Sequence, residues 1–187
     1  MLIENKGIKT DTFYLPPFVL NEGEIIVVYL TNVPDCYDNG MFLKDIFTGK
    51  TKHENVIIFK NLTFVEHFKE SKFRRFFYPI TVGEYLKKNA DLSSPFSNKI
   101  YENNWIKKNT HVNTLAGTPR KLLSLYSTLS RTKDIVFDLA ALDPLGVENT
   151  YEIVKEVTMN GGSAILLDCF EVMKNNCSKY IELQLIK

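Results

Sequence analysis

The residues whose types and spacing could support chemistry lie in the segment DIVFDLAALDPLG, residues 134–146. An apolar run leads into Asp138, and a second carboxylate follows at Asp143. A buried strand that delivers a carboxylate to a nucleotide-bound Mg²⁺ is a recurring part of phosphoryl-transfer sites. Leu139 follows directly and cannot accept a proton, so this segment lacks a general base next to the carboxylate. A metal ligand and a carboxylate that only caps a nearby turn are therefore both possible roles for Asp138.

A carboxylate of this kind works together with a phosphate-binding loop, whose pattern is G-x-x-x-x-G-K-[ST] between a strand and a helix. In the corresponding place, the sequence TNVPDCYDNGM, residues 31–41, follows an apolar run and precedes the helix-like segment MFLKDIF. It has one glycine and no Lys or Arg, and it carries Asp35 and Asp38. Pro34 also removes one backbone donor. We expect this segment to form a loop that repels a triphosphate. A second match, Gly49-Lys50-Thr51, lacks the preceding strand and glycine and reads as a polar turn.

The elements that must position these residues alternate along most of the chain. Continuous β-branched and apolar runs predict buried strands, and apolar residues at helical spacing next to Thr, Pro and Gly signals predict helices. The expected strands are 23–30, 54–59, 134–138, 163–168 and 180–186, and the expected helices are 41–47, 80–92, 118–130 and 146–160. Thr81 and Glu84 are expected to form a capping box at the start of the second helix, and Thr118 is the candidate N-cap of the third. Trp105 is the one large apolar anchor expected in the polar stretch 93–113. This alternation predicts an α/β fold with a mainly parallel sheet covered by helices.

Composition limits the class of protein further. The chain has 187 residues, 44% of them hydrophobic, which suits one globular domain, 1–187. Its net charge of +1 gives no overall field for nucleic acid or for an anionic membrane. Cys36, Cys169 and Cys177 are odd in number and form no C-x-x-C pair, so we expect reduced thiols in a cytoplasmic protein. No run is long and apolar enough to span a membrane, and the N-terminus does not resemble a secretion signal.

The order of these pieces resembles the ATP-binding cassette (ABC) ATPase domain over nearly the whole chain. LNEGEIIVVYL resembles the strand before that family's phosphate loop, and FYPITVGEYLKKNADL the segment beyond its glutamine-bearing loop. LAGTPRKLLSLYSTLSRTKDIVFDLAALDP resembles the signature motif, its helix, the Walker B strand and the D-loop. NGGSAILLDCFE resembles the switch-histidine strand. The resemblance implies a P-loop NTPase-like fold in which the helical subdomain is truncated to about residues 84–118.

The resemblance also implies roles for particular residues. The nucleotide-binding positions would be Thr31, Asn32, Asn39, Gly40, Met41, Asp138 and Asp143, with Asp138 the candidate metal ligand. The signature-like positions would be Leu115, Ala116, Gly117 and Thr118, and Phe170 would stand at the switch position in place of histidine. Lysine, glutamate and histidine are therefore missing from the three positions on which hydrolysis depends.

The leading interpretation is a catalytically inactive ABC ATPase-like protein that acts through protein interaction or as a transporter accessory subunit. Its partner would be a second copy, an active ABC ATPase subunit or a membrane permease, so contact with the membrane would be indirect. No cofactor is expected. The alternative is an ATP-binding subunit of an ABC-type transporter whose rebuilt phosphate loop still binds nucleotide and Mg²⁺. A nucleic-acid adaptor, suggested by the basic and aromatic residues of 67–78, is disfavoured because acids dilute the patch.

Overall fold

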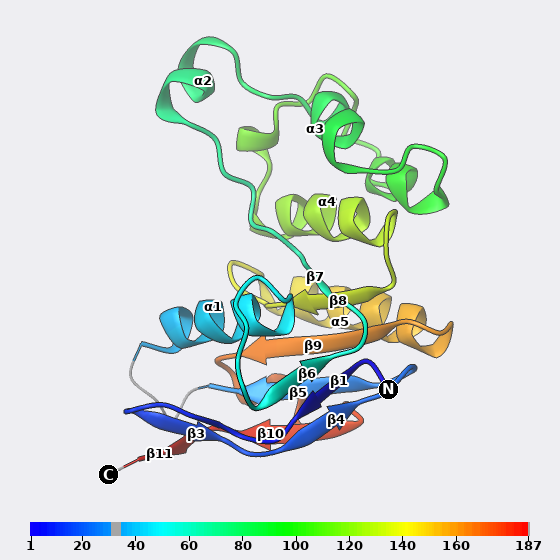
Figure 1. The fold of residues 1–187 in the computed structure, drawn as a ribbon. Coiled ribbons are helices and arrows are strands. Elements are labelled where there is room, and N and C mark those ends of the chain that lie inside the picture. The colour runs from blue at the N-terminus through cyan, green and yellow to red at the C-terminus, as the bar shows by residue number, and fades with distance from the viewer. Residues whose placement is uncertain (31–34, 187) are drawn as a thin grey trace. The chain divides into compact units, whose positions relative to one another are not determined.

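The chain folds into two compact units in a computed structural model that describes residues 1–30 and 35–186. Unit 1 comprises residues 1–64, 133–139 and 152–187, and unit 2 comprises residues 65–132 and 140–151. Unit 2 begins before the helical insert expected at about 84–118 and extends beyond it (Figure 1).

A parallel sheet lies at the centre of unit 1, as the alternation of apolar runs predicts. Its strand order is β10-β5-β9-β8-β7, and each neighbouring pair in it is parallel. The strands are β5 (Ile25–Tyr29), β7 (Thr63–Phe64), β8 (Asp134–Phe137), β9 (Ser163–Asp168) and β10 (Lys179–Glu182). The three strands β5, β8 and β9 are buried along their whole length, which is why their sequences are continuous rather than alternating apolar runs.

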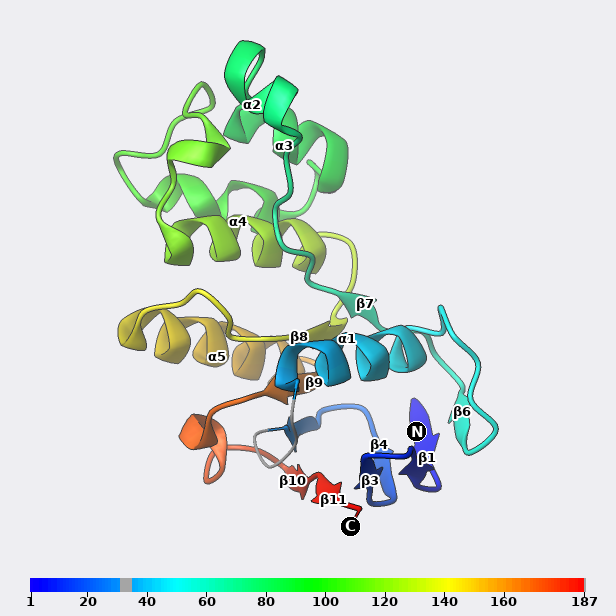
Figure 2. The same ribbon diagram turned by 90° about the vertical axis from the view of Figure 1, so that its left-hand side faces the viewer.

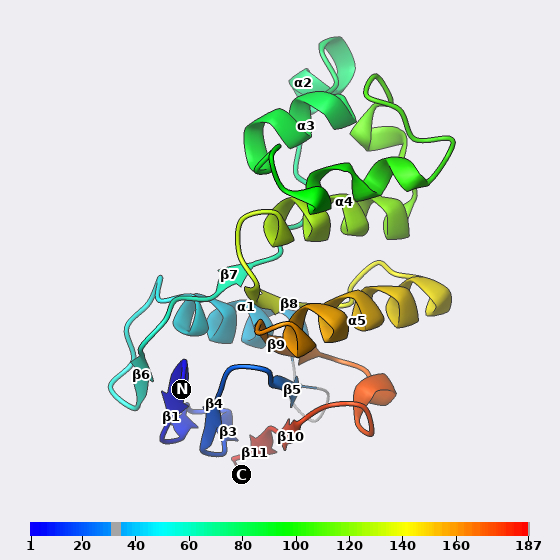
Figure 3. The same cartoon turned by 90° about the vertical axis from the view of Figure 1, so that its right-hand side faces the viewer.

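The two faces of this sheet are covered by different elements. Ile26, Val28 and Ile165 belong to the core cluster that also contains Leu43 and Phe47 of helix α1 (Cys36–Phe47). Their sequence neighbours point to the opposite face, because successive side chains of a strand alternate. That face is covered by the part of α5 (Pro144–Met159) that belongs to unit 1, residues 152–159, so α1 and this part of α5 lie on opposite sides of the sheet (Figure 2, Figure 3).

Short antiparallel strands complete the core on the side of α1. One three-stranded sheet has the order β4-β1-β6 and the other the order β11-β3-β2. Their strands are β1 (Ile3–Asn5), β2 (Ile8–Lys9), β3 (Phe13–Leu15), β4 (Phe18–Leu20), β6 (Val56–Ile58) and β11 (Gln184–Leu185). The run expected as a strand at 54–59 is therefore a strand, and it pairs with β1 in the antiparallel layer. The expected strand 180–186 divides into β10 and β11, which belong to different sheets.

Helix α1 begins at Cys36, so the prediction of a loop over residues 36–40 is wrong. The apolar periodicity explains the difference. Gly40, Leu43 and Phe47 are buried on one face, and Cys36 continues that face one turn earlier. Packing against the sheet therefore extends the helix through Asp38 and Asn39, which are poor helix formers. The turn expected at Gly49 is present, with a φ of 75° at that glycine.

Unit 2 contains mainly short helices. They are α2 (Lys72–Phe77), α3 (Val82–Asn89), α4 (Gly117–Leu129) and the 3₁₀ segments Pro95–Glu102 and Val112–Thr114. The capping box predicted at the start of α3 is present, because Thr81 and Glu84 each accept a hydrogen bond from the other's backbone N–H. Trp105, which the sequence suggests as an apolar anchor, is 58% exposed.

Candidate functional site

The site suggested by the sequence lies at the carboxyl edge of the parallel sheet, where β5, β8 and β9 end. In open α/β sheets this edge is where ligands bind. Asp35 precedes α1 and adopts a left-handed conformation, with φ 58° and ψ 45°. In sequence, residues 30–35 separate β5 from α1. This segment has the same length as the part of the phosphate-loop motif that runs from its first glycine to its second. If the two patterns are aligned by strand end and helix start, Asp35 stands at the second glycine, Cys36 at the lysine and Tyr37 at the hydroxyl position.

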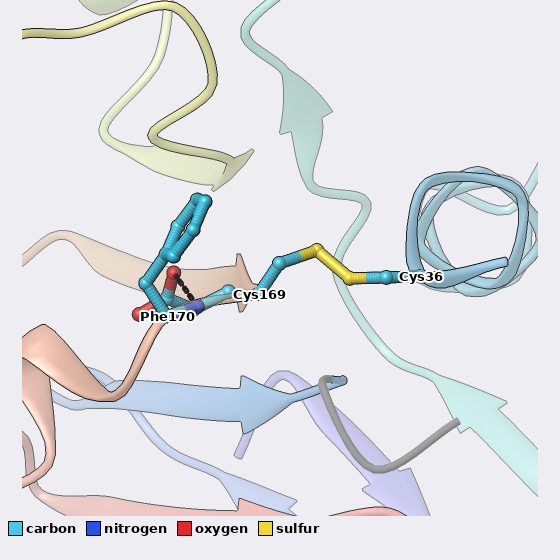
Figure 4. Close-up of a disulfide and its surroundings, with 4 residues drawn as sticks. Cys36, Cys169 and Phe170 are labelled. Atoms are coloured by element: carbon cyan, nitrogen blue, oxygen red, sulfur yellow. Dashed lines mark hydrogen bonds between the residues drawn. A yellow bond between two sulfur atoms is a disulfide. The ribbon is translucent and has the colours of Figure 1, made fainter. Parts of the chain in front are cut away.

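Cys36 is joined to Cys169 by a disulfide, with their Cα atoms 6.3 Å apart (Figure 4). Cys36 opens α1, and Cys169 follows the last residue of β9. The prediction of three reduced thiols is therefore wrong for this pair, while Cys177 is a free, half-buried thiol whose pKa is raised by burial. Cysteine count and spacing could not show the pair, since topology alone brings positions 133 residues apart together. The bond ties the helix start to the strand end at the place where the motif requires a cation.

Two carboxylates lie at the ends of neighbouring strands at this edge of the sheet. Asp138 follows β8 and is 8% exposed, and Asp168 ends β9 and is 2% exposed. Burial, together with the nearby charge of Asp138, raises the pKa of Asp168 to about 6, against the opposing effect of hydrogen bonds from the backbone N–H groups of Phe170 and Cys169. Burial and the neighbouring acid both disfavour the ionised form of Asp168.

The described residues at this edge of the sheet bring acidic rather than basic side chains together. Asp35 and Asp38 add two exposed acids at the start of α1. The described segments 35–43 and 163–173 contain no Lys or Arg. The N-terminus of a helix ordinarily favours a bound anion. At the start of α1, the carboxylates of Asp35 and Asp38 already lie at this end of the helix. Within the described ranges, no group of three or more His, Cys, Asp or Glu side chains is arranged to hold a metal ion.

The structure places the predicted nucleotide-binding residues of α1 away from the helix start. Thr31 and Asn32 lie outside the described residues. Asn39 begins the second turn of α1, and its backbone N–H donates to the carbonyl oxygen of Asp35 at 3.0 Å. Gly40 is buried next to Leu30, and Met41 packs against the core. These three residues are displaced because the helix begins earlier than the sequence suggests.

Phe170, predicted for the switch position, directly follows the disulfide. Its side chain is 64% exposed and points in a different direction from the bond (Figure 4). Its backbone N–H donates to Oδ1 of Asp168 at 3.0 Å. A phenyl ring cannot donate a hydrogen bond to a phosphate. What Phe170 contributes is its backbone N–H, which orients the Asp168 carboxylate.

The signature-like residues are held by contacts within unit 2. Leu115 is buried, and its carbonyl oxygen accepts a hydrogen bond from Nη2 of Arg120. Ala116 is the N-cap of α4, which corrects the prediction that Thr118 caps this helix. Gly117 is required at its position, because a Cβ atom there would overlap the carbonyl oxygen of Ala141. The backbones of these two residues therefore lie close together at the start of α4.

Asp143 joins this segment to the start of α5. Its Oδ2 accepts from the Thr118 hydroxyl at 2.6 Å, and its Oδ1 accepts from the backbone N–H of Gly146 at 2.8 Å. The hydrogen bond from Thr118, followed by the one from Gly146, lowers the pKa of the Asp143 carboxyl. Asp143, predicted as a possible nucleotide contact, therefore has both oxygens engaged in fixing the local backbone.

Sequence reasoning missed three members of the site, namely Cys36, Cys169 and Asp168. A signal for Cys36 was present, because the apolar face of α1 continues to it from Gly40. The position of Asp168 at a strand end was predictable from SAILLD, but its closeness to Asp138 depends on the pairing of β8 with β9. No local pattern in the sequence encodes that pairing.

No protein-family model and no curated protein matches the sequence at a significant level. Solved structures do match. An ABC transporter ATP-binding protein from Pyrococcus furiosus, described as putative, superposes with a TM-score of 0.72 at 15% identity, covering 97% of each chain. A metal-chelate-type ABC transporter, also described as putative, gives a TM-score of 0.70 at 13% identity, with 100% of this chain and 83% of the other covered. CbiO1 from Clostridium perfringens, part of the ABC transporter complex CbiONQ, gives 0.64 at 12% identity, covering 100% and 87%.

These similarities agree with the five-stranded parallel sheet, its flanking helices and the order of elements along the chain. They confirm the resemblance at the level of architecture, and at identities of 12–15% they concern the fold alone. Among the described residues, no helix combines the length and apolar character needed to cross a bilayer. The chain has the fold of the ATP-binding subunits of ABC transporters.

Proposed function

We propose that this chain is a non-hydrolysing ABC ATPase-like subunit that acts by binding another protein. The observation that carries the proposal is the disulfide between Cys36 and Cys169, which occupies the start of α1 where a phosphate-binding lysine would stand. The surrounding acids and the leucine after Asp138 support it, since neither charge neutralisation nor proton abstraction has a described residue to perform it.

Magnitudes support weak nucleotide binding. A charge-assisted hydrogen bond contributes roughly 1.5–3 kcal/mol. Losing the lysine and two further contacts of that kind would forfeit about 4–9 kcal/mol, or about three to six orders of magnitude in affinity. The acidic residues at the helix start oppose binding further.

The partners that fit this proposal are a second copy, an intact ATP-binding subunit or a membrane permease. In a heterodimer, residues 115–118 would contribute shape to the interface, because their polar groups already have local partners. We expect analytical ultracentrifugation to detect self-association if the partner is a second copy. A permease or intact ATPase encoded next to this chain is the first candidate for co-expression and for a pairwise binding measurement.

The decisive test is calorimetric titration with Mg-ATP together with a phosphate-release assay on the oxidised protein. We expect neither binding heat nor turnover at millimolar nucleotide. The matched variant is Asp138→Ala, which removes the one carboxylate that the family resemblance assigns to the metal. Turnover in the unmodified protein that Asp138→Ala abolishes would refute the proposal.

A second candidate is an ATP-binding subunit with a rebuilt phosphate loop, and the structural neighbours favour it because those reported are ATP-binding proteins or transporter components. It requires that nucleotide bind without the lysine. A thermal-shift comparison with and without Mg²⁺ separates the two candidates. Stabilisation by Mg-ATP that Asp138→Ala removes supports this second candidate, and equal melting temperatures under all conditions reject it.

A further inference from the structure

Helix α2 of unit 2 presents an aromatic face that no part of unit 2 covers (Figure 3 labels the helix). None of its residues is buried, and Phe73, Phe76 and Phe77 are 68%, 81% and 57% exposed. The Phe77 ring contacts both of the others, because the ring centroids of Phe73 and of Phe76 each lie 4.9 Å from that of Phe77. Positions i, i+3 and i+4 share one side of a helix, so the rings form a single patch.

Local hydrogen bonds hold this helix in place without burial. A helix of six residues is too short to be stable alone. Ser71 caps it by accepting from the backbone N–H of Arg74 at 3.3 Å. Glu70 accepts from the backbone N–H of Ile80 at 2.7 Å, which closes the base of the excursion 70–80. Polar contacts therefore hold the helix in a position where three phenyl rings face solvent, although their exposure is unfavourable.

Cationic side chains border the aromatic patch on both sides. By helical spacing, Lys72 lies along one flank of the phenylalanines and Arg74 along the other, whereas Arg75 lies on the face of the helix away from them. All three are exposed, and Lys69 lies just before the helix. The acid within the excursion, Glu70, is already engaged with Ile80. The exposed surface is therefore apolar in the middle and positive at both edges.

We propose that α2 docks onto the surface of an anionic phospholipid bilayer. Phenyl rings in the middle of the patch would enter the boundary between headgroups and acyl chains, and the flanking cations would meet lipid phosphates. A bilayer presents anionic groups on every side of an inserted aromatic cluster, which matches cations on both flanks. A protein groove would need acidic residues along both rims to give the same complementarity.

The test is co-sedimentation with vesicles of phosphatidylcholine and phosphatidylglycerol, compared with vesicles of phosphatidylcholine alone. We expect binding only to the anionic vesicles, and a loss of at least about tenfold in Phe76→Ser/Phe77→Ser. The matched control is Phe59→Ser, which removes a phenylalanine that is 56% exposed in unit 1 and is expected to leave binding unchanged. Circular dichroism of each variant checks that the fold is retained.

A variant with reversed charges tests the same proposal independently of the phenylalanine variant. In Lys72→Glu/Arg74→Glu, the two flanking cations become acids, and at roughly fivefold per charge near the surface we expect more than a tenfold loss. The proposal is overturned if the protein does not bind anionic vesicles, or if both double variants still bind them. Binding that appears only when a permease is reconstituted in the vesicles, or a change of oligomeric state in the phenylalanine variant, overturns it in favour of a protein occupant. The measurement does not involve nucleotide, so its outcome is separate from that of the ATP assays.

Discussion

At the scale of single residues, the carboxyl edge of the sheet brings two buried acids close together. Asp138 and Asp168 end neighbouring parallel strands, and the charge of one disfavours ionisation of the other. The pKa of Asp168 is raised to about 6, well above the value of an aspartate in an unfolded chain. The native state therefore binds a proton between about pH 4 and pH 6 that the unfolded state releases.

We predict that Asp168→Asn stabilises the protein at neutral pH. Because the folded pKa is raised, the unmodified protein gains stability as pH falls through 6 and reaches its full value below about pH 4. The amide keeps an oxygen that can accept from Phe170 and carries no charge, so it removes a penalty of about 1–2 kcal/mol at pH 7.5. Urea denaturation of both proteins at pH 4 and pH 7.5 checks this. A stability difference at pH 4 as large as that at pH 7.5 would contradict the electrostatic origin.

At the scale of elements, the buried strands and most helix positions were predictable because hydrophobic periodicity reports burial directly. The sequence identified β5, β8 and β9, the capping box of α3 and the end of α5 before Gly161. It placed the start of α1 too late, since residues 36–40 are rich in polar side chains and their helical state depends on packing at Cys36 and Gly40. Asp138 was predictable as a strand-end carboxylate, whereas the disulfide at the same edge required knowledge of which strands are neighbours.

The disulfide predicts that unit 1 depends on redox conditions. Joining α1 to β9 across 133 residues restricts the unfolded chain, and reduction should lower the free energy of unfolding by about 2–4 kcal/mol. Urea melts with and without a thiol reductant measure this difference. Cys177→Ser is the matched control and should keep the sensitivity to reductant, whereas Cys36→Ser/Cys169→Ser should lose it. Equal melts of the unmodified protein in both conditions would contradict the prediction.

The start of α3 gives a prediction about local stability. Thr81→Ala removes the hydroxyl that accepts from the backbone N–H of Glu84, and we expect a loss of about 1 kcal/mol. Thr81→Ser keeps a hydroxyl and should lose much less. Equilibrium denaturation of the three proteins measures the effect. If the alanine and serine variants are equally destabilised, the cap does not contribute as proposed.

At the scale of the whole molecule, basic and acidic residues nearly balance, with 23 of the former and 22 of the latter. Affinity for nucleic acid depends on the number of phosphates that cationic side chains neutralise. The excursion 70–80, which has a local excess of cations, is short and has its aromatic rings clustered with one another.

We therefore predict that the protein does not retain nucleic acid. Filter binding of single-stranded DNA and RNA, measured at low salt and at physiological salt, is expected to show no retention at either. Retention at physiological salt would contradict this prediction. Retention at low salt alone would also contradict it, and its loss in Lys72→Glu/Arg74→Glu would locate a weak electrostatic contact at α2.

The bond between Cys36 and Cys169 also has a topological consequence for the second unit. Every residue of unit 2 lies between these two positions, so the unit belongs to a covalent ring closed in unit 1. A protease that nicks one exposed loop of unit 2, such as the one near Trp105, leaves two fragments that still migrate as one species in non-reducing electrophoresis. They separate once the sample is reduced. The disulfide in unit 1 therefore keeps the two fragments of a cleaved unit 2 covalently joined.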